Sequence, residues 1–92
     1  MTEFEWDPAK EMQNIRKHDV SFHEAQSAFA DSLSMTIPDP DNSDGERRFV
    51  LLGMTSEGRL VVVPYTERGD RIRIISARLA TRREILQYES KT

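Results

Sequence analysis

Arginine is concentrated in one short part of this chain. Residues 68–83 contain six arginines and a single aspartate, although the whole chain has a formal net charge of −3. A guanidinium group stays charged, binds two phosphate oxygens at once and stabilises additional negative charge on a reacting phosphate. The cluster therefore indicates that an anion, and most simply a phosphodiester, binds at one place on an otherwise acidic protein.

The stretch RIRIISAR at 71–78 predicts how these arginines are presented. A regular strand directs Arg71 and Arg73 to its open face, at the spacing of neighbouring phosphates, and the intervening isoleucines to the core. Arg78 falls on the wrong side of this alternation, unless a bulge near residues 74–75 resets it or the strand ends first. The alternative is a solvated face whose arginines pair with nearby carboxylates.

Cleavage of RNA is a reaction that such a face could support without a metal ion. The 2′-hydroxyl is an internal nucleophile, so the protein must move protons and stabilise the phosphorane. His18 and Lys17 adjoin at the end of a predicted helix, and Lys10 and Asn14 share a helical face with Lys17. The chain has no cysteine and no histidine motif for zinc, so we expect neither a metal nor a cofactor.

Each of these residues also has an ordinary structural explanation. His18 is equally a helix-terminal or packing residue, and Lys10 and Lys17 are typical of a solvated helix face. Tyr65 is a candidate to donate a proton or stack on an RNA base, although a tyrosine at this position is as readily buried. Trp6 is better explained as a core anchor than as a stacking platform.

The elements that must position these residues begin with a strand and two helices. FEWD at 4–7 alternates as a short strand does, and Asp7 followed by Pro8 predicts a helix over 8–18 with Met12 and Ile15 facing inward. A second helix begins at Ser21, where Glu24 completes the spacing of a capping box. The short link between the helices predicts a helical hairpin.

Four strands and a helix are predicted next, at residues 33–37, 47–55, 59–68, 70–78 and 82–90. Short connections containing glycine make the last three strands an antiparallel meander, and Thr81 with Glu84 predicts a capping box at the start of the helix. Residues 39–46 read as an acidic, turn-rich loop. The order βααββββα predicts a single α+β domain over residues 1–92, a mainly antiparallel sheet with helices against one side.

The composition also bears on location. No apolar run approaches the ~20 residues that cross a membrane, the N-terminus has no signal-peptide pattern, and the absence of cysteine suits a reducing compartment. We therefore expect a cytoplasmic protein that does not bind membranes.

Four stretches together resemble the BrnT toxin family of bacterial type II toxin–antitoxin modules. They are FEWDPAK at 4–10, NIRKHDVSFHEA at 14–25, RRFVLLGMTSEGRLVVV at 47–63 and TERGDRIRIISARLATRREILQYE at 66–89. The resemblance implies a RelE-like ribonuclease fold and an endoribonuclease that halts translation. It also implies a hetero-oligomer with a BrnA-like antitoxin that carries a DNA-binding domain.

By this resemblance, the catalytic candidates are the basic residues of the matching segments, Lys10, Lys17, His18, Arg73 and Arg78. The candidates for RNA binding are Arg71, Arg82, Arg83 and Tyr65. Two residues depart from the family pattern: Asp19 stands where glycine is common, and Pro64 interrupts a strand that should end, bulge or lie at an edge there. The alternative function is a non-catalytic module whose basic face docks an acidic antitoxin or nucleic acid.

Overall fold

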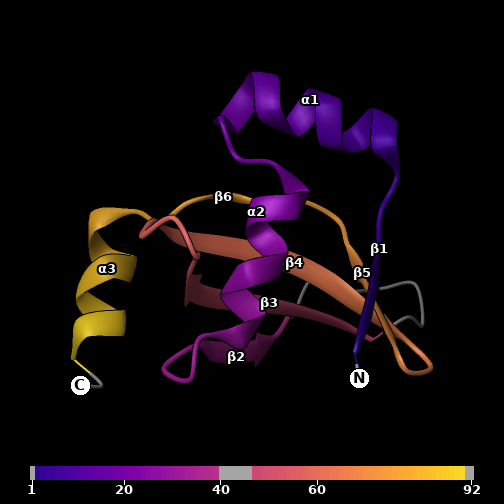
Figure 1. Cartoon of the computed structure of the whole chain (residues 1–92). Helices are drawn as coiled ribbons and strands as arrows, with labels where there is room; N and C mark the ends of the chain where they lie inside the picture. Colours follow the sequence, from indigo (N-terminus) through magenta and orange to yellow (C-terminus); the bar gives the residue numbers. More distant parts are fainter. Residues whose placement is uncertain (1, 40–46, 91–92) are drawn as a thin grey trace.

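The computed structural model describes residues 2–39 and 47–90. In chain order the elements are β1 (Glu3–Glu5), α1 (Pro8–His18), α2 (Phe22–Ser27), the 3₁₀ helix η1 (Ala28–Ala30), β2 (Met35–Pro38), β3 (Arg48–Met54), β4 (Leu60–Arg68), β5 (Arg71–Ile74), β6 (Arg78–Leu79) and α3 (Arg82–Glu89). The predicted α+β class and element order are confirmed, except that the strand expected at 70–78 is divided in two (Figure 1). Of the predicted loop at 39–46, residues 40–46 lie outside the described residues.

The strands form one mixed sheet in the order β1-β5-β4-β3-β2. The long strand β4 is its centre: the C-terminal part pairs with β5, and the N-terminal part pairs with β6. Among the strand pairings of residues 2–39 and 47–90, only that of β1 with β5 is parallel. The connections on either side of β4 contain Gly58 and Gly69, whose φ angles of 78° and 63° are easily adopted by glycine. The antiparallel meander is therefore confirmed.

The two faces of the sheet are covered by different helices. One face, with Val63 and Tyr65 of β4 and Ile74 of β5, packs against the buried side chains of α2. The opposite face, with Leu52 and Val62, packs against Tyr88 of α3. In Figure 1, α2 lies in front of the sheet, α3 stands at one end, and α1 runs along the upper edge. The expectation of helices against one side only is therefore wrong.

Helix α1 has the predicted limits but not the predicted inward face. Asp7 caps the helix by accepting a hydrogen bond from the Ala9 N–H at 2.9 Å. Met12 and Ile15, expected inside, are 56% and 38% exposed, and the buried residue of α1 is Asn14. The helix crosses an edge of the sheet, where backbone polar groups need partners, so an amide is buried there instead of an aliphatic side chain.

Helix α2 begins at Ser21 as predicted, but its capping box is only half formed. The Ser21 hydroxyl accepts from the Glu24 N–H at 2.9 Å, whereas the Glu24 carboxylate binds Arg59 and Thr55. Glu11 of α1 instead accepts from the first N–H groups of α2, which joins the two helices. They cross and do not run side by side, so the expected hairpin is correct in its short link only (Figure 1).

Helix α3 is held at both ends. Thr81 and Glu84 form both hydrogen bonds of the predicted capping box. Near its C-terminus, the Tyr88 hydroxyl donates to the Asp31 carboxylate, which raises the pKa of Tyr88 to about 12. Burial opposes ionisation of Asp31, but the hydrogen bond from Tyr88 and two from backbone N–H groups outweigh it and lower the Asp31 pKa.

Candidate active site

A bulge at residues 75–77 determines how Arg73 and Arg78 are related. Arg73 lies opposite Thr66 of β4, and Arg78 lies opposite Val62. Between these pairs, the four residues 74–77 lie opposite the three residues 63–65 of β4, and the one extra residue reverses the alternation. Arg73 and Arg78 therefore project from the same face of the sheet, with their backbones roughly 13 Å apart at about 3.3 Å per strand residue. Both alternatives that the sequence left open therefore describe this segment, because β5 ends at Ile74 and one extra residue is inserted before β6 begins at Arg78.

Pro64 is accommodated opposite this bulge. Its carbonyl accepts from the Ile75 N–H at 3.0 Å. The N–H and C=O of a residue in an antiparallel strand point to the same neighbour, so the missing N–H of Pro64 faces the place where the ladder is already interrupted. Strand β4 consequently continues through Pro64, and the expected irregularity lies in the partner run and not in β4.

Asn14 holds the bulge against α1. Its Nδ2 donates to the carbonyls of Val20 and Ala77, both at 2.8 Å. Its Oδ1 accepts from the Ser76 hydroxyl and the Ala77 N–H, both at 3.2 Å. The residue is 7% exposed, and its amide uses all four of its hydrogen-bonding positions. Asn14 therefore supports the site from beneath and does not extend a phosphate-binding face with the lysines.

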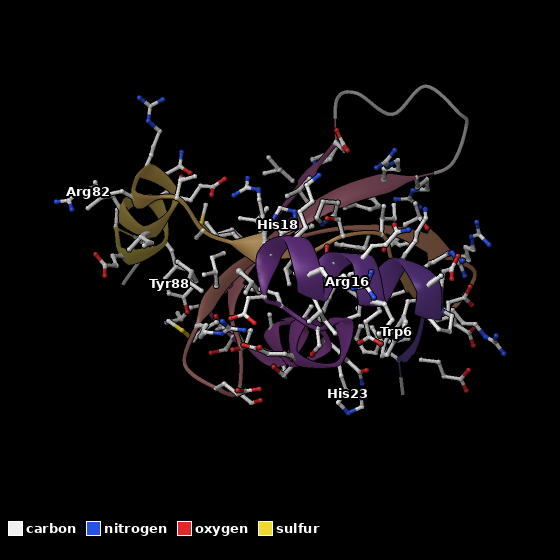
Figure 2. The ribbon with its side chains drawn as sticks, turned by 90° about the horizontal axis from the view of Figure 1, so that it is seen from above. Trp6, Arg16, His18, His23, Arg82 and Tyr88 are labelled. Carbon is white, nitrogen blue, oxygen red and sulfur yellow. The ribbon has the colours of Figure 1, made fainter. Side chains whose placement is uncertain are left out.

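A groove of about 240 Å³ opens beside Asn14, between α1 and the bulge; we call it the α1 groove. Its lining residues are Lys10, Gln13, Asn14, Lys17, His18, Ile75 and Ser76. Both lysines are exposed, and within residues 2–39 and 47–90 neither forms an ion pair. Figure 2 shows His18 on the side of α1 away from His23. Three predicted site residues of α1, namely Lys10, Lys17 and His18, thus lie next to Ile75 and Ser76 of the segment 71–78.

The arginines of the sheet face already have carboxylate partners. Arg73 donates to Glu5 at 2.9 Å, and Arg71 lies 3.6 Å from Glu5 and 3.3 Å from Glu3. Arg78 binds both oxygens of Glu84, at 2.8 and 2.9 Å. The two guanidinium groups therefore turn toward β1 and α3 and not toward each other. The sequence left open the alternative that these arginines pair with nearby carboxylates, and the structure shows this pairing.

These ion pairs keep both carboxyl groups ionised. The hydrogen bond from Arg73 lowers the pKa of Glu5. The hydrogen bonds from Arg78 outweigh burial and lower the pKa of Glu84 from 4.5 to about 2. The side chains of Arg73 and Arg78 are nevertheless 32% and 40% exposed. A phosphate that binds them must therefore compete with a carboxylate at an accessible position.

The remaining candidates for RNA binding lie in contrasting places. Arg82 and Arg83 begin α3, are exposed, and form no ion pair in the described part of the chain. Figure 2 shows Arg82 at the outer side of α3. Tyr65 is only 6% exposed, and its ring packs against Phe29 and Phe49 with centroids 5.0 and 5.5 Å away. Tyr65 therefore has no ring face for a base, and its assignment as an RNA-binding residue is corrected.

Sequence reasoning missed the residues that hold the site together. Asn14 and Ser76 fix the bulge, while Glu5 and Glu84 hold the arginines. Glu84 was read only as a capping residue, and Glu5 only as the polar half of an alternating strand. The sequence places Asn14 on one helical face with Lys10 and Lys17 but carries no signal that it is buried.

Two searches for other kinds of site were negative. Residues 2–39 and 47–90 contain no group of three or more histidine, cysteine, aspartate or glutamate side chains arranged to hold a metal ion. Among the described helices, none is both long and apolar enough to span a membrane.

Comparison with protein families shows which family the chain belongs to. The model of the family described as the ribonuclease toxin BrnT of type II toxin–antitoxin systems matches residues 6–84. This chain belongs to the BrnT family. The matched part includes the α1 groove, the bulge and both arginines that flank it. Membership assigns the chain to the ribonuclease toxins of type II systems, whose partner is an antitoxin.

A solved structure supports the fold independently. The crystal structure of the ribonuclease toxin BrnT of Brucella abortus superposes with a TM-score of 0.67, covering 89% of this chain and 99% of that one. The two chains are 21% identical, so the match shows that they share the α+β fold. A search of proteins with curated descriptions gave no match.

Proposed function

We propose that this BrnT-family chain cleaves RNA in the α1 groove without a metal ion, and that this cleavage stops translation in the cytoplasm. The observation that carries the proposal is the meeting of Lys10, Lys17 and His18 at one groove against the bulge, with Arg73 and Arg78 on one sheet face at either side of it. An RNA strand that follows this edge encounters a cation at each step.

The proposed reaction uses the 2′-hydroxyl as nucleophile. A base takes its proton as the oxygen attacks the adjacent phosphorus, and an acid protonates the departing 5′-oxygen as its bond to phosphorus breaks. The products are a 2′,3′-cyclic phosphate and a 5′-hydroxyl. Imidazole is the side chain best suited to proton exchange near neutral pH, so we assign both transfers to His18 in turn: it takes the proton of the 2′-hydroxyl as the phosphorane forms, and gives that proton to the 5′-oxygen as the phosphorane collapses. Lys10 and Lys17 then stabilise the charge on the phosphorane.

The arginines have a different assignment in this proposal. Arg73 and Arg78 stand roughly 13 Å apart along the sheet, a separation that suits two phosphates flanking the cleaved bond better than the cleaved phosphate alone. Binding exchanges Glu5 and Glu84 for phosphate oxygens. Arg71, Arg82 and Arg83 extend the basic track on either side. The proposed inhibitor is a BrnA-like antitoxin with a DNA-binding domain.

Controlled expression in bacteria tests the proposal. Wild type should arrest growth and generate new RNA ends, and Lys17→Ala and His18→Ala should each abolish both effects. Arg16→Ala is the matched control, because Arg16 is exposed on the same helix but does not line the groove. If His18→Ala and Lys17→Ala are as toxic as Arg16→Ala, the groove is not the cleavage site.

A second expression experiment tests the arginines. Arg73→Ala combined with Arg78→Ala should remove RNA cleavage. Arg16→Ala combined with Arg47→Ala is the control, because it removes the same charge from exposed positions outside the site, and it should leave RNA cleavage in place. Equal RNA cleavage by the two double variants would contradict the assignment of Arg73 and Arg78.

The second candidate function is a binding module that does not cut RNA. The pairing of Arg73 and Arg78 with carboxylates favours it, because the same face would accept an acidic protein. Such a module would bind RNA or its partner without creating 2′,3′-cyclic phosphate ends. Sequencing of RNA ends after induction therefore separates the two functions.

A further inference from the structure

A second groove lies on the sheet face beside α3, and we call it the α3 groove. It measures about 170 Å³ and is walled by aliphatic side chains of three strands and by polar side chains of α3: Met35, Ile37, Val50, Leu52, Val62, Glu84 and Gln87. Ile37 and Val50 are direct cross-strand neighbours, and Ile37 is 57% exposed. The proposed RNA cleavage uses none of these aliphatic residues.

On the α3 side of this groove, the described charged residues Arg78, Arg83 and Glu84 sum to one positive charge. Glu84 is the carboxylate in its wall, and Arg78 neutralises it through two hydrogen bonds. Arg83 precedes Gln87 by four residues and so lies on the same side of α3. Arg83 has no ion pair within the described residues, and the N-terminal end of a helix adds partial positive charge. A ligand that is apolar along the strands and carries acidic groups near Arg83 would therefore match the groove in polarity and charge.

We propose that the α3 groove receives an amphipathic segment of the antitoxin, with apolar side chains against Ile37 and Val50 and acidic side chains toward Arg83. The proposal rests on the proposed function for its partner, since a type II toxin acts together with an antitoxin. It adds a docking surface distinct from the α1 groove. The α3 groove is linked to the proposed RNA-binding arginines through Glu84, which lines the groove and binds Arg78.

This link provides a route to inhibition. A segment seated against Glu84 shields the Glu84–Arg78 ion pair from water and so makes it harder for a phosphate to displace Glu84 from the Arg78 guanidinium. Arg78 is then withheld from RNA although the segment does not enter the α1 groove. Because the aliphatic wall contributes affinity and the basic end contributes charge, each part can be tested separately.

The first test is calorimetric titration with the antitoxin encoded beside the toxin gene. Ile37→Asp places a charge in the aliphatic wall, and Met12→Asp makes the same change on α1, at 56% exposure and outside the α3 groove. We expect Ile37→Asp to weaken binding at least about tenfold, which is the effect of losing one buried aliphatic contact. Met12→Asp should remain within about twofold of wild type, and both variants should still cleave RNA.

The second test changes only charge. Gln87→Glu should weaken binding of the antitoxin and Gln87→Lys should strengthen it, with the difference decreasing as salt is added. Equal effects of the two substitutions would overturn the acidic character assigned to the partner.

Other results overturn the docking proposal as a whole. These are wild-type affinity in Ile37→Asp, absence of any complex with wild type, or a free-chain dimer that Ile37→Asp dissociates while antitoxin affinity is unchanged. If wild type binds antitoxin through the α3 groove but cuts no RNA, the docking surface stands and the proposed function fails. If RNA is cut but Ile37→Asp binds normally, only the docking surface fails.

Discussion

Replacement of Asn14 by alanine tests the physical core of the site. Asn14→Ala removes four hydrogen bonds, three that join α1 to the bulge and one to the Val20 carbonyl, and two of the partner residues, Val20 and Ala77, are completely buried. At about 1 kcal/mol net for each bond, the loss is about 4 kcal/mol. The better helix propensity of alanine returns roughly 0.6 kcal/mol. We therefore expect a net destabilisation of about 3 kcal/mol.

Urea unfolding followed by circular dichroism measures this loss. A domain of this size is stable by roughly 5–14 kcal/mol, so the variant should still fold but with a lower midpoint. With a slope of about 1.5 kcal/mol per molar urea, the midpoint should fall by about 2 M. RNA cleavage by the folded variant should also decrease, because the bulge that carries Ser76 loses its support.

Two further variants make the Asn14 test specific. Asn14→Asp preserves shape but cannot donate to the two carbonyls at neutral pH, so it should be at least as unstable as Asn14→Ala. Gln13→Ala removes an exposed neighbour and should change stability by less than about 0.5 kcal/mol. An Asn14→Ala protein within about 1 kcal/mol of wild type would refute the idea that this amide holds the bulge.

Three other predictions concern stability. Asp19 adopts φ 58° and ψ 33°, a left-handed conformation that glycine adopts more easily than aspartate. Asp19→Gly should therefore raise the free energy of unfolding in urea by about 0.5–1 kcal/mol. A lower free energy of unfolding in the variant would mean that the Asp19 side chain matters more than its backbone conformation. The pKa of Tyr88 is raised from 10.0 to about 12, so its hydrogen bond contributes fully to the free energy of unfolding below pH 10.0, and this contribution is lost as pH rises through about 12. Tyr88→Phe should remove this alkaline decline in pH-dependent unfolding. A decline that persists in the variant would refute this prediction. The pKa of Glu84 is lowered from 4.5 to about 2, so its ion pair with Arg78 contributes fully to the free energy of unfolding above pH 4.5, and this contribution is lost as pH falls through about 2. Glu84→Gln should reduce this loss of stability in acid. An unchanged dependence of stability on acid pH would contradict the importance of the ion pair.

The elements were predictable because their signals are local. Asp7 with Pro8, Ser21 and Thr81 all begin helices as expected, since a cap depends on backbone groups within three residues of it. Glycines in the hairpin connections were equally informative. Asp19 stands where the family commonly has glycine, and its left-handed backbone is the conformation that glycine adopts most easily.

The packing of those elements was not predictable in the same way. Asn14 is buried because it binds Ala77, 63 residues further along the chain, and nothing near Asn14 encodes that contact. Met12 and Ile15 have the spacing of an inward stripe, but the edge of the sheet presents polar backbone to α1. Tyr65 was ambiguous because strand alternation does not tell which face becomes covered.

The candidate site was predicted in part. Lys17 and His18 were named from the sequence as candidates for the same site as the arginine-rich strand. In the structure both residues line the α1 groove, next to Ile75 and Ser76. The need for a bulge or a strand end before Arg78 was also anticipated. The ion pairs of Arg73 with Glu5 and of Arg78 with Glu84 depend on the pairing of β1 with β5 and on the position of α3, so their specific partners were not foreseen.

The most direct measurement of the central claim uses one RNA oligonucleotide that the purified chain cuts at a single position. We expect cleavage to continue in excess EDTA and to leave a 2′,3′-cyclic phosphate, because the 2′-hydroxyl is the proposed nucleophile. The same oligonucleotide with a single 2′-deoxynucleotide at that position should resist cleavage, and His18→Ala should not cut the original. Cleavage that requires a divalent metal ion, or that proceeds equally at the 2′-deoxynucleotide, would contradict the account.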